Sequence, residues 1–417
     1  MRILLVADMR SPHSVGWVHG LTEIGVEPLV VSSRRLSPAE RATMPDHIRR
    51  HVIHEPADAL SRARSFTTLH PYALDAVRSL ARHRKTATRT IQNQRSTPEG
   101  TGRFELPLEL CIARQLGREV SSLVHRHNPD LVHALRIPFE GISVTSVAAS
   151  WPTAISIWGQ DLARQAPAAS RLAKATRRSL ANIHGLHADC QRDIDLAREW
   201  GAPADAINLV AAGNMGYDQD VFNALGTEHN ERKIIFCPRG PGSPINYTGF
   251  LRVANSLTQR YSDIQFVAAR LSGNAAAEDI RKRSAHPERI ILTGNLSVPE
   301  LADIYRRSLA VVSPSVSDGT PNSVLEGMSC GAIPLVGDIA PLRELLGTEL
   351  PRSLFDPLDE DEMEQRLIEI LDAPERQSIE YSEVAQQIAT SGWSRGATFS
   401  RVQTWYEQLT SDRQRRT

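Results

Sequence analysis

The sequence lacks closely spaced cysteines, long apolar runs and a net charge. No apolar stretch approaches the roughly 18 residues that a membrane-spanning helix needs. The 48 basic and 48 acidic residues cancel, which argues against a dedicated nucleic-acid binder, because such proteins need a basic excess. The cysteines are too far apart for a zinc or CxxC redox site and fit buried free thiols in a reducing compartment. These cysteines are Cys111, Cys190, Cys237 and Cys330. We expect a cytoplasmic protein.

Apolar runs and helical patterns alternate through the first half of the chain. Residues 2–7 and 27–32 read as buried strands, and the helical spacing between them ends at Gly25, a residue suited to stop a helix. The first run meets Asp8 too early for a signal peptide. Further strands are predicted over 130–134, 153–157 and 206–211.

A second series of the same kind begins near residue 232. Strand-like runs occur at 233–237, 264–268, 289–293, 309–313 and 332–336. Since 417 residues exceed what one core usually supports, we predict an α/β fold of two Rossmann-like, doubly wound domains. The boundary is expected within 213–231, and we divide the domains into 1–215 and 216–390.

Two polar segments have no place in this scheme. Residues 84–103 lack hydrophobic periodicity and contain several basic residues but a single acidic one, Glu99. A solvated surface loop is the simpler interpretation, and contact with an anionic acceptor or a membrane surface is the alternative. A second basic cluster follows the helical spacing and has the same two interpretations. It comprises Arg171, Lys174, Arg177 and Arg178.

The most specific motif is SPSVSDGTPNSVLEGMSCG at 313–331. It predicts a strand end, a tight turn and then a helix with Pro321 as its first residue and Gly331 after its end. The free N–H groups and the dipole of such a helix attract a phosphate or sugar hydroxyls. Asn322 and Glu326 share one helix face, which places a carboxylate one turn below that end. Carboxylates accept hydrogen bonds from ribose or sugar diols.

The motif resembles the E-x7-E donor motif of retaining GT-B glycosyltransferases of the family 4 type, the glycosyl transferases group 1. The resemblance implies that Asp318 lies near the transferred sugar and that Glu326 binds the ribose. The chain departs from the family in having Asp318 where Glu is usual. The implied donor-binding residues are Arg239, Gly240, Gly242, Gly294, Asp318, Gly319, Thr320, Pro321, Asn322, Ser323 and Glu326.

A glycine-rich loop, CPRGPGSP at 237–244, follows the first strand of the second domain. Glycines allow close approach of a ligand, and the Arg239 guanidinium matches a diphosphate. Family members usually carry a Lys several residues after this Arg. The stretch here reads PINYTG instead, so Asn246 or Tyr247 is expected near that place.

The first domain is expected to contribute the acceptor side. His13 and Ser14 follow the first strand in a loop that resembles the first loop of the family, and Asp161 matches the H-G-x-D element. Trp158 replaces the His of that element. Because an indole is neither acid nor base, Trp158 is expected to stack on a sugar or acceptor ring.

The resemblance implies transfer of a hexose or related sugar from a nucleoside diphosphate, uridine diphosphate above others, with retained configuration. Asp318 and Arg239 are then the catalytic residues, and the acceptor stays unidentified. We expect no cofactor and no obligatory metal, since Asp193-Ile194-Asp195 fits a helix face better than a metal motif. Residues 391–417 resemble the terminal helix that crosses back to the first domain.

Two other functions stay open. One is a GT-B sugar-nucleotide epimerase or phosphorylase. The other is a non-catalytic relative that binds a sugar nucleotide or a partner protein, which the absent Lys, the absent His and the Asp318 replacement would suit.

Overall fold

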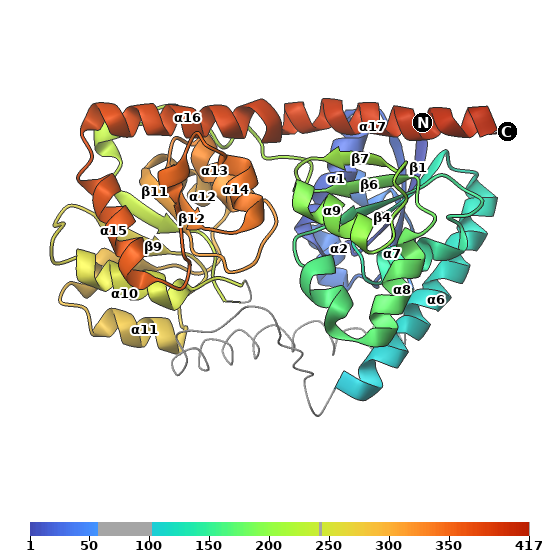
Figure 1. The fold of residues 1–417 in the computed structure, drawn as a ribbon, viewed down its shortest axis with the longest axis horizontal. Coiled ribbons are helices and arrows are strands. Elements are labelled where there is room, and N and C mark those ends of the chain that lie inside the picture. Colours follow the sequence, from blue (N-terminus) through green and yellow to red (C-terminus); the bar gives the residue numbers. More distant parts are fainter. Residues whose placement is uncertain (57–101, 242–243, 417) are drawn as a thin grey trace. The chain divides into compact units, whose positions relative to one another are not determined.

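The computed structural model describes residues 1–56, 102–241 and 244–416 (Figure 1). The chain divides into two compact units. Unit 1 comprises Met1–Met215 and Thr398–Thr417, and unit 2 comprises Gly216–Ala397. The polar segment 84–103 lies outside the described residues, apart from its last two, which begin a helix. No described helix is both long enough and apolar enough to cross a membrane.

Unit 1 contains a seven-stranded parallel sheet with the order β3-β2-β1-β4-β5-β6-β7. Its strands are β1 (Arg2–Ala7), β2 (Glu27–Ser32), β3 (Val52–His54), β4 (Leu131–Leu135), β5 (Thr153–Ile157), β6 (Gly185–Ala188) and β7 (Ile207–Val210). Its helices are α1 (Pro12–Glu23), α2 (Pro38–Thr43), α3 (Asp46–Arg49), α6 (Gly102–His127), α7 (Glu140–Ser143), α8 (Ser170–Leu180), α9 (Gln191–Glu199) and α17 (Arg395–Arg416).

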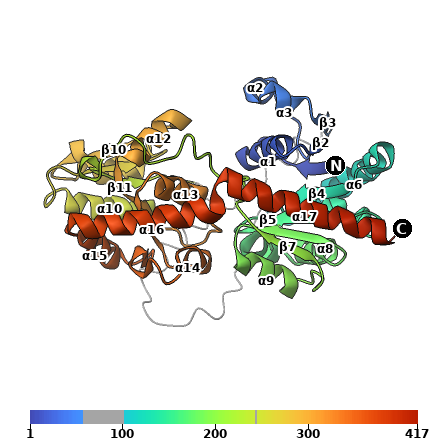
Figure 2. The same ribbon diagram turned by 90° about the horizontal axis from the view of Figure 1, so that it is seen from above.

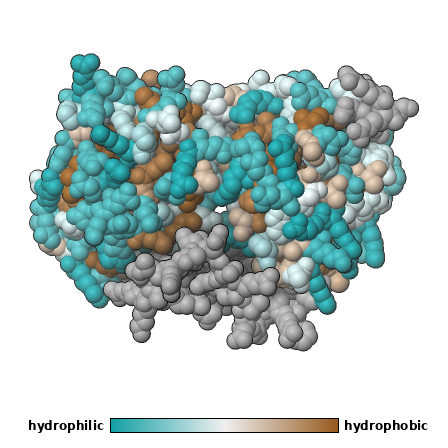
Figure 3. All heavy atoms as spheres, viewed as in Figure 1, coloured by the Kyte–Doolittle hydropathy of each residue, from teal (hydrophilic) through white to brown (hydrophobic). Residues whose placement is uncertain are grey.

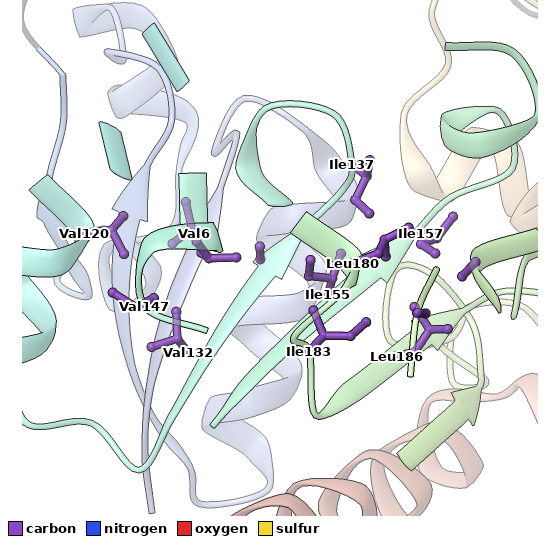
Figure 4. Packing of buried hydrophobic residues seen from close by; sticks show 14 of the residues in the cluster. Val6, Val120, Val132, Ile137, Val147, Ile155, Ile157, Leu180, Ile183 and Leu186 are labelled. Atoms are coloured by element: carbon purple, nitrogen blue, oxygen red, sulfur yellow. The ribbon is translucent and has the colours of Figure 1, made fainter. Parts of the chain in front are cut away.

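Helices cover both faces of this sheet, so its strands are apolar on both sides. Leu4 and Val6 of β1 belong to one buried cluster with Val120 of α6 and Val132 of β4. Figure 4 shows Val6, Val120 and Val132 in this cluster. The alternate residues of β1 pack toward α1 and α17. The continuous apolar run at 2–7 is explained by this double coverage, since successive strand side chains point to opposite faces.

Unit 2 contains a six-stranded parallel sheet with the order β10-β9-β8-β11-β12-β13. Its strands are β8 (Ile234–Cys237), β9 (Gln265–Ala268), β10 (Ile290–Leu292), β11 (Ser308–Ser313), β12 (Ile333–Gly337) and β13 (Leu354–Phe355). Its helices are α10 (Tyr247–Leu257), α11 (Ala275–Lys282), α12 (Val298–Arg306), α13 (Asn322–Ser329), α14 (Ala340–Leu346), α15 (Glu360–Leu371) and α16 (Glu375–Trp393). Helices again line both faces. Hydrophilic residues cover most of the face drawn in Figure 3.

All the strands predicted from the sequence are present, within one or two residues at each end. Three further strands were missed. The strands β3 and β13 have three and two residues at sheet edges, and β6 carries the polar residue His187. The predicted start of α13 was wrong by one residue, because Pro321 has an extended ψ of 120° and precedes the first helical residue.

The last helix packs on the sheet of unit 1 (Figure 2). A break at Ser394 separates α16 from α17, where the sequence predicted one helix over 391–417. Four residues of α17 join the core beside β1 and α1. They are Val402, Trp405, Tyr406 and Leu409.

A chain of buried hydrogen bonds connects α17 to this sheet. Trp17 Nε1 donates to Tyr406 Oη at 2.9 Å. Tyr406 Oη lies 2.7 Å from His133 Nδ1, and His133 Nε2 lies 2.9 Å from Ser156 Oγ. Ser156 Oγ lies 2.8 Å from His187 Nδ1, and His187 Nε2 lies 3.1 Å from the Ala211 carbonyl.

The two ends of this series of hydrogen bonds determine which group donates at each step between them. The Trp17 N–H can only donate, and the Ala211 carbonyl can only accept. Tyr406 therefore donates to His133, His133 to Ser156, Ser156 to His187, and His187 to Ala211. Both imidazoles are neutral and carry their proton on Nε2. A second proton on either ring would have no acceptor.

We predict that the stability of unit 1 falls in mild acid. Burial lowers the pKa of His187 to about 3 and that of His133 well below its usual value. Below a pH of about 6.5 the unfolded chain takes up protons that the folded chain excludes. The free energy of unfolding therefore decreases by about 1.4 kcal/mol per pH unit for each of the two histidines.

Denaturant unfolding followed by tryptophan fluorescence at pH 7.5, 6.5 and 5.5 measures this slope. Five of the six tryptophans report on unit 1, namely Trp17, Trp151, Trp158, Trp200 and Trp405. The matched variant is His187→Gln, whose amide keeps one donor and one acceptor but does not titrate. In this variant the free energy of unfolding should fall less steeply with decreasing pH, by about 1.4 kcal/mol per pH unit, because one titrating histidine is removed. An unchanged slope would contradict the prediction.

Candidate functional site

The order in which strands are added to the sheet of unit 2 changes side between the neighbouring strands β8 and β11. From β8 the chain continues to β9 and β10 on one side, then returns to β11 on the other. The loops after β8 and β11 therefore lead away from each other at the carboxyl edge of the sheet. Such a switch point is where ligands bind in open α/β sheets.

The two predicted catalytic residues meet at this switch point. Arg239 follows β8 and Asp318 follows β11, and Arg239 Nη1 forms an ion pair with Asp318 Oδ2. The other Asp318 oxygen accepts a hydrogen bond from the Gly319 N–H at 3.0 Å. The side chains of Arg239 and Asp318 are 22% and 16% exposed, so both are accessible to a ligand. Burial lowers the pKa of the Arg239 guanidinium.

Helix α13 begins directly after this pair. The Asn322 Oδ1 atom at its first residue is buried and has no hydrogen-bond partner among the residues that the structure describes. An unpartnered buried acceptor calls for a donor such as a sugar hydroxyl. Thr320 and Pro321 are buried, and Ser323 is half-buried.

Glu326 lies one turn further along α13, beside the buried Tyr305 of α12. Burial raises the pKa of Glu326 to about 8, and the Tyr305 hydroxyl opposes part of that rise. Near neutral pH much of this carboxyl is therefore protonated. The proton leaves if a ligand donates hydrogen bonds to the carboxylate, because such bonds favour the charged form.

The glycines predicted to bind the donor have different surroundings. A Cβ at Gly240 would lie 2.8 Å from the Ala269 carbonyl oxygen and 2.9 Å from the Arg270 Cβ. Gly240 is thus required by the packing of the loop after β8 on the loop after β9. A Cβ at Gly294 would meet nothing within 4 Å. Gly242 lies outside the described residues.

Arg270 was missed by the sequence analysis. It has a positive φ of 62°, is exposed, and its charge contributes to the lowered pKa of Arg239. Within the described chain it forms no ion pair. Arg270 follows the end of β9 by two residues, as Arg239 follows β8, and this equal offset was the available signal. Asn246, which was expected near the place of the absent Lys, instead caps α10, where its side chain accepts from the Gly249 N–H at 3.0 Å.

Three of the residues predicted for the acceptor side gather at the carboxyl edge of the unit 1 sheet. The ring centroids of His13 and Trp158 are 5.2 Å apart, and the backbone N–H of Trp158 donates to Asp161 Oδ2 at 3.2 Å. Trp158 Nε1 is buried and finds no hydrogen-bond partner within the described part of the chain. Ser14 is different, since it is 1% exposed within α1.

Asp161 is the fully buried centre of this group. Its carboxylate accepts hydrogen bonds from Arg136 at 2.8 Å and from the Ile137 N–H at 3.2 Å. Burial raises the pKa of Asp161, and Arg136 opposes the rise. Asp161 therefore joins the loops after β4 and β5. Arg136, which lies 5.9 Å from the Trp158 ring centroid, was not singled out from the sequence.

One group of described residues has a spacing compatible with a metal ion. The ligand atoms of Asp189, Cys190 and Asp193 lie within 4.8 Å of one another. Arg192 already pairs with Asp193 at 2.8 Å, and burial raises the pKa of the Cys190 thiol. A metal ion here would have to displace the ion pair of Arg192 and Asp193, and we assign no metal to this group of residues.

The basic cluster predicted on a helix face lies on α8. Arg171, Lys174, Arg177 and Arg178 are all exposed. The Arg177 guanidinium lies 4.7 Å from the Trp200 ring centroid, so one of the four has a local packing role. Contact of this cluster with a membrane stays a prediction.

Residues 231–373 match the family model described as Glycosyl transferases group 1. The resemblance seen in the sequence is thereby confirmed over most of unit 2. A comparison with curated proteins finds no match.

Solved structures match the whole chain. Sucrose-phosphate synthase from Thermosynechococcus elongatus has a TM-score of 0.66 at 13% identity, with 99% of this chain and 100% of that chain covered. The UDP-forming α,α-trehalose-phosphate synthase from Burkholderia xenovorans has a TM-score of 0.67 at 11% identity, with 98% and 99% covered. Anabaena HepE in complex with UDP and glucose has a TM-score of 0.61 at 13% identity, with 99% and 100% covered. The predicted GT-B fold is confirmed.

We predict that Asp161→Ala destabilises unit 1 by about 3 kcal/mol, because Arg136 and two buried N–H groups lose their acceptor. Denaturant unfolding measures the loss. Asp130→Ala is the matched control, since that carboxylate accepts one hydrogen bond from the exposed Arg2 N–H, and it should cost about 1 kcal/mol or less. Equal losses in the two variants would contradict the role given to Asp161.

Proposed function

We propose that this protein is a glycosyltransferase that moves a sugar from a nucleoside-diphosphate donor, with UDP as the expected nucleotide, to an unidentified acceptor with retention of configuration. The ion pair of Arg239 and Asp318 at the switch point of unit 2 carries the proposal. It places a cation and an acid together directly before α13. The family match over this unit supports the same chemistry.

In this proposal the donor lies along the carboxyl edge of unit 2. The ribose hydroxyls donate to Glu326, and the diphosphate binds Arg239 in place of Asp318. Asp318, released from Arg239, accepts hydrogen bonds from the transferred sugar. The buried Asn322 oxygen accepts another sugar hydroxyl.

Charge stabilisation of the leaving diphosphate is the main catalytic contribution that these residues offer. Arg239, Arg270 and the amino end of α13 supply positive charge or donors at one place. The reaction proposed here requires no cofactor and no metal ion. His13 and Trp158 of unit 1 are proposed to contact the acceptor, and the buried Asp161 is proposed to position the loop that carries Trp158.

All four cysteines are free, and three of them are buried as expected, whereas Cys111 is exposed. Free cysteines suit the cytoplasmic location that we also propose.

A thermal-shift screen with UDP, GDP, ADP and dTDP, with and without attached sugars, tests the donor. Selective stabilisation by one nucleotide is expected, on the order of 2.7 kcal/mol at a hundredfold excess over the dissociation constant. No shift with any nucleotide would favour a non-catalytic relative. Nucleotide release that depends on an acceptor would exclude an epimerase and a phosphorylase as alternatives.

Two variants in the same motif separate binding from catalysis. Glu326→Ala should weaken nucleotide affinity by about tenfold, because ribose hydrogen bonds are lost. Asp318→Ala should not weaken the nucleotide affinity, and should raise it if anything, because the diphosphate no longer displaces a carboxylate from Arg239. It should slow the release of nucleotide from the sugar donor by about 100-fold, since the contact of Asp318 in the complex is with the sugar. Equal and small effects would mean that the donor binds elsewhere. With the pKa of Glu326 at about 8, wild-type affinity should also rise from pH 6 to pH 8, and Glu326→Gln should remove this rise.

We further propose that Arg270 binds the diphosphate in place of the missing Lys. Arg270→Ala should weaken UDP binding by about tenfold and leave binding of uridine unchanged. Arg270→Lys should restore part of the affinity, because it keeps the charge. The control is Arg283→Ala, which removes an exposed arginine of unit 2 paired with Asp279. Equal losses for uridine and UDP would show that Arg270 acts on the fold of the site alone.

A further inference from the structure

Tyr305 of α12 is a fully buried side chain that packs beside α13. Its ring centroid lies 5.1 Å from that of Phe236 and 6.0 Å from that of Phe222, both in edge-to-face geometry. On the side of α13, a Cβ at Gly327 would lie 3.2 Å from Tyr305 Cδ1, so the helix backbone packs closely against the ring. These contacts leave the ring little freedom and therefore fix the place of its hydroxyl.

The Tyr305 hydroxyl is buried and forms no hydrogen bond with any residue that the structure describes. A buried tyrosine hydroxyl usually has a partner, because an unpaired polar group costs free energy. The titratable groups that act on it electrostatically are Glu326, Cys330, Arg239 and Cys237. Tyr305 thus lies close to both residues proposed for the donor, one for the ribose and one for the diphosphate.

Of these neighbours, Glu326 is the one that can use the hydroxyl. Burial raises the pKa of Tyr305 well above its usual value, so the hydroxyl keeps its proton and can donate it. Arg239 has no acceptor and already donates to Asp318. A carboxylate, in contrast, is a strong acceptor.

The two thiols near Tyr305 are poor partners for its hydroxyl. Burial raises the pKa of Cys237 and that of Cys330 to about 12, so both thiols are protonated near neutral pH and accept only weakly. Tyr305 is also the one described side chain that lowers the pKa of Glu326. The carboxyl of Glu326 is therefore the group on which Tyr305 acts.

We propose that Tyr305 is a positioning residue for the donor, which donates to one oxygen of the Glu326 carboxylate and holds the other oxygen toward the ribose. The inference rests on the proposed function, because that function assigns the ribose to Glu326. Tyr305 itself is 0% exposed, whereas Glu326 is only half-buried. Tyr305 thus acts on the ligand through Glu326 alone.

The hydrogen bond forms when the donor binds. In the ligand-free protein Glu326 is largely protonated near neutral pH, and a neutral carboxyl is a weaker acceptor than a carboxylate. When the ribose hydroxyls donate to Glu326, its proton passes to solvent, and the negative charge strengthens the hydrogen bond from Tyr305. The hydroxyl that is unpaired in the ligand-free protein thereby gains its acceptor in the complex.

The first experiment follows Glu326 in the ligand-free protein. Infrared difference spectra between each protein and its Glu326→Gln variant isolate the C=O stretch of the protonated Glu326 carboxyl, and the pH at which this band is half lost gives the midpoint of its titration. Tyr305→Phe should raise the midpoint by roughly 0.5–1 pH unit, because a donor to the carboxylate is removed. The fold should be retained, since the variant removes a hydroxyl that has no described partner.

The second experiment measures binding by calorimetry between pH 6 and pH 8.5. The probe is UDP-glucose, or the nucleotide sugar that the thermal-shift screen selects, because its diphosphate diester does not titrate in this range. Tyr305→Phe should weaken binding about fivefold at pH 7 and shift the rise of affinity to higher pH. In a Glu326→Gln background the same substitution should leave affinity unchanged, since no carboxylate remains to be positioned.

Tyr217→Phe is the matched control. Tyr217 belongs to the same core cluster, is 2% exposed, and its hydroxyl likewise forms no hydrogen bond with a described residue. Glu326 is not among the groups that act on it, so this variant should leave the midpoint of Glu326 and the pH dependence of binding unchanged.

The outcomes separate this inference from the proposed function. An unchanged midpoint in Tyr305→Phe overturns the inference even if the nucleotide sugar binds. Equal losses of affinity with and without the Glu326→Gln substitution also overturn it, because they would show a structural role alone. If the midpoint rises but the wild-type protein binds no nucleotide, the proposed function fails, and the role of Tyr305 in ribose binding fails with it.

Discussion

The parallel direction of all paired strands in both sheets is the constraint on which the candidate sites depend. Because every strand of a sheet points the same way, the loops that follow the strands collect at one edge. Arg239, Arg270 and Asp318 are far apart in the sequence and come together only for this reason. The opposite edge receives the loops that lead into the strands. Each sheet thus has two chemically different edges.

The fold was largely predictable because its main signal is local. A strand covered on both faces must be apolar at nearly every position, and the runs at 2–7 and 309–313 have this character. The missed strands lack it. The strands β3 and β13 are edge pieces of three and two residues, too short to show a period. The strand β6 contains His187, whose burial depends on partners in β5 and in the loop after β7.

The candidate site was predictable where one motif carried it and not where distant residues were needed. Asp318, Asn322 and Glu326 lie within nine residues of each other, so their spacing could be judged from the sequence. Arg270 and Arg136 could not be recognised in this way, because their significance comes from neighbours across the sheet. The buried hydrogen-bonding roles of His133 and His187 could not be recognised from the sequence either. Each has a polar partner on both ring nitrogens, and these partners come from β5, from the loop after β7 and from α17.

The division of the chain also bears on the order in which the protein is made. Unit 2 is one continuous segment, whereas unit 1 needs residues from both ends of the described chain. A ribosome releases the chain from its amino end, and domains fold as units during synthesis. Throughout translation of unit 2, the nascent unit 1 therefore lacks Trp405 and Tyr406, with an apolar sheet face uncovered and His133 without its tyrosine donor. The core of unit 1 is therefore completed only when α17 is available to it.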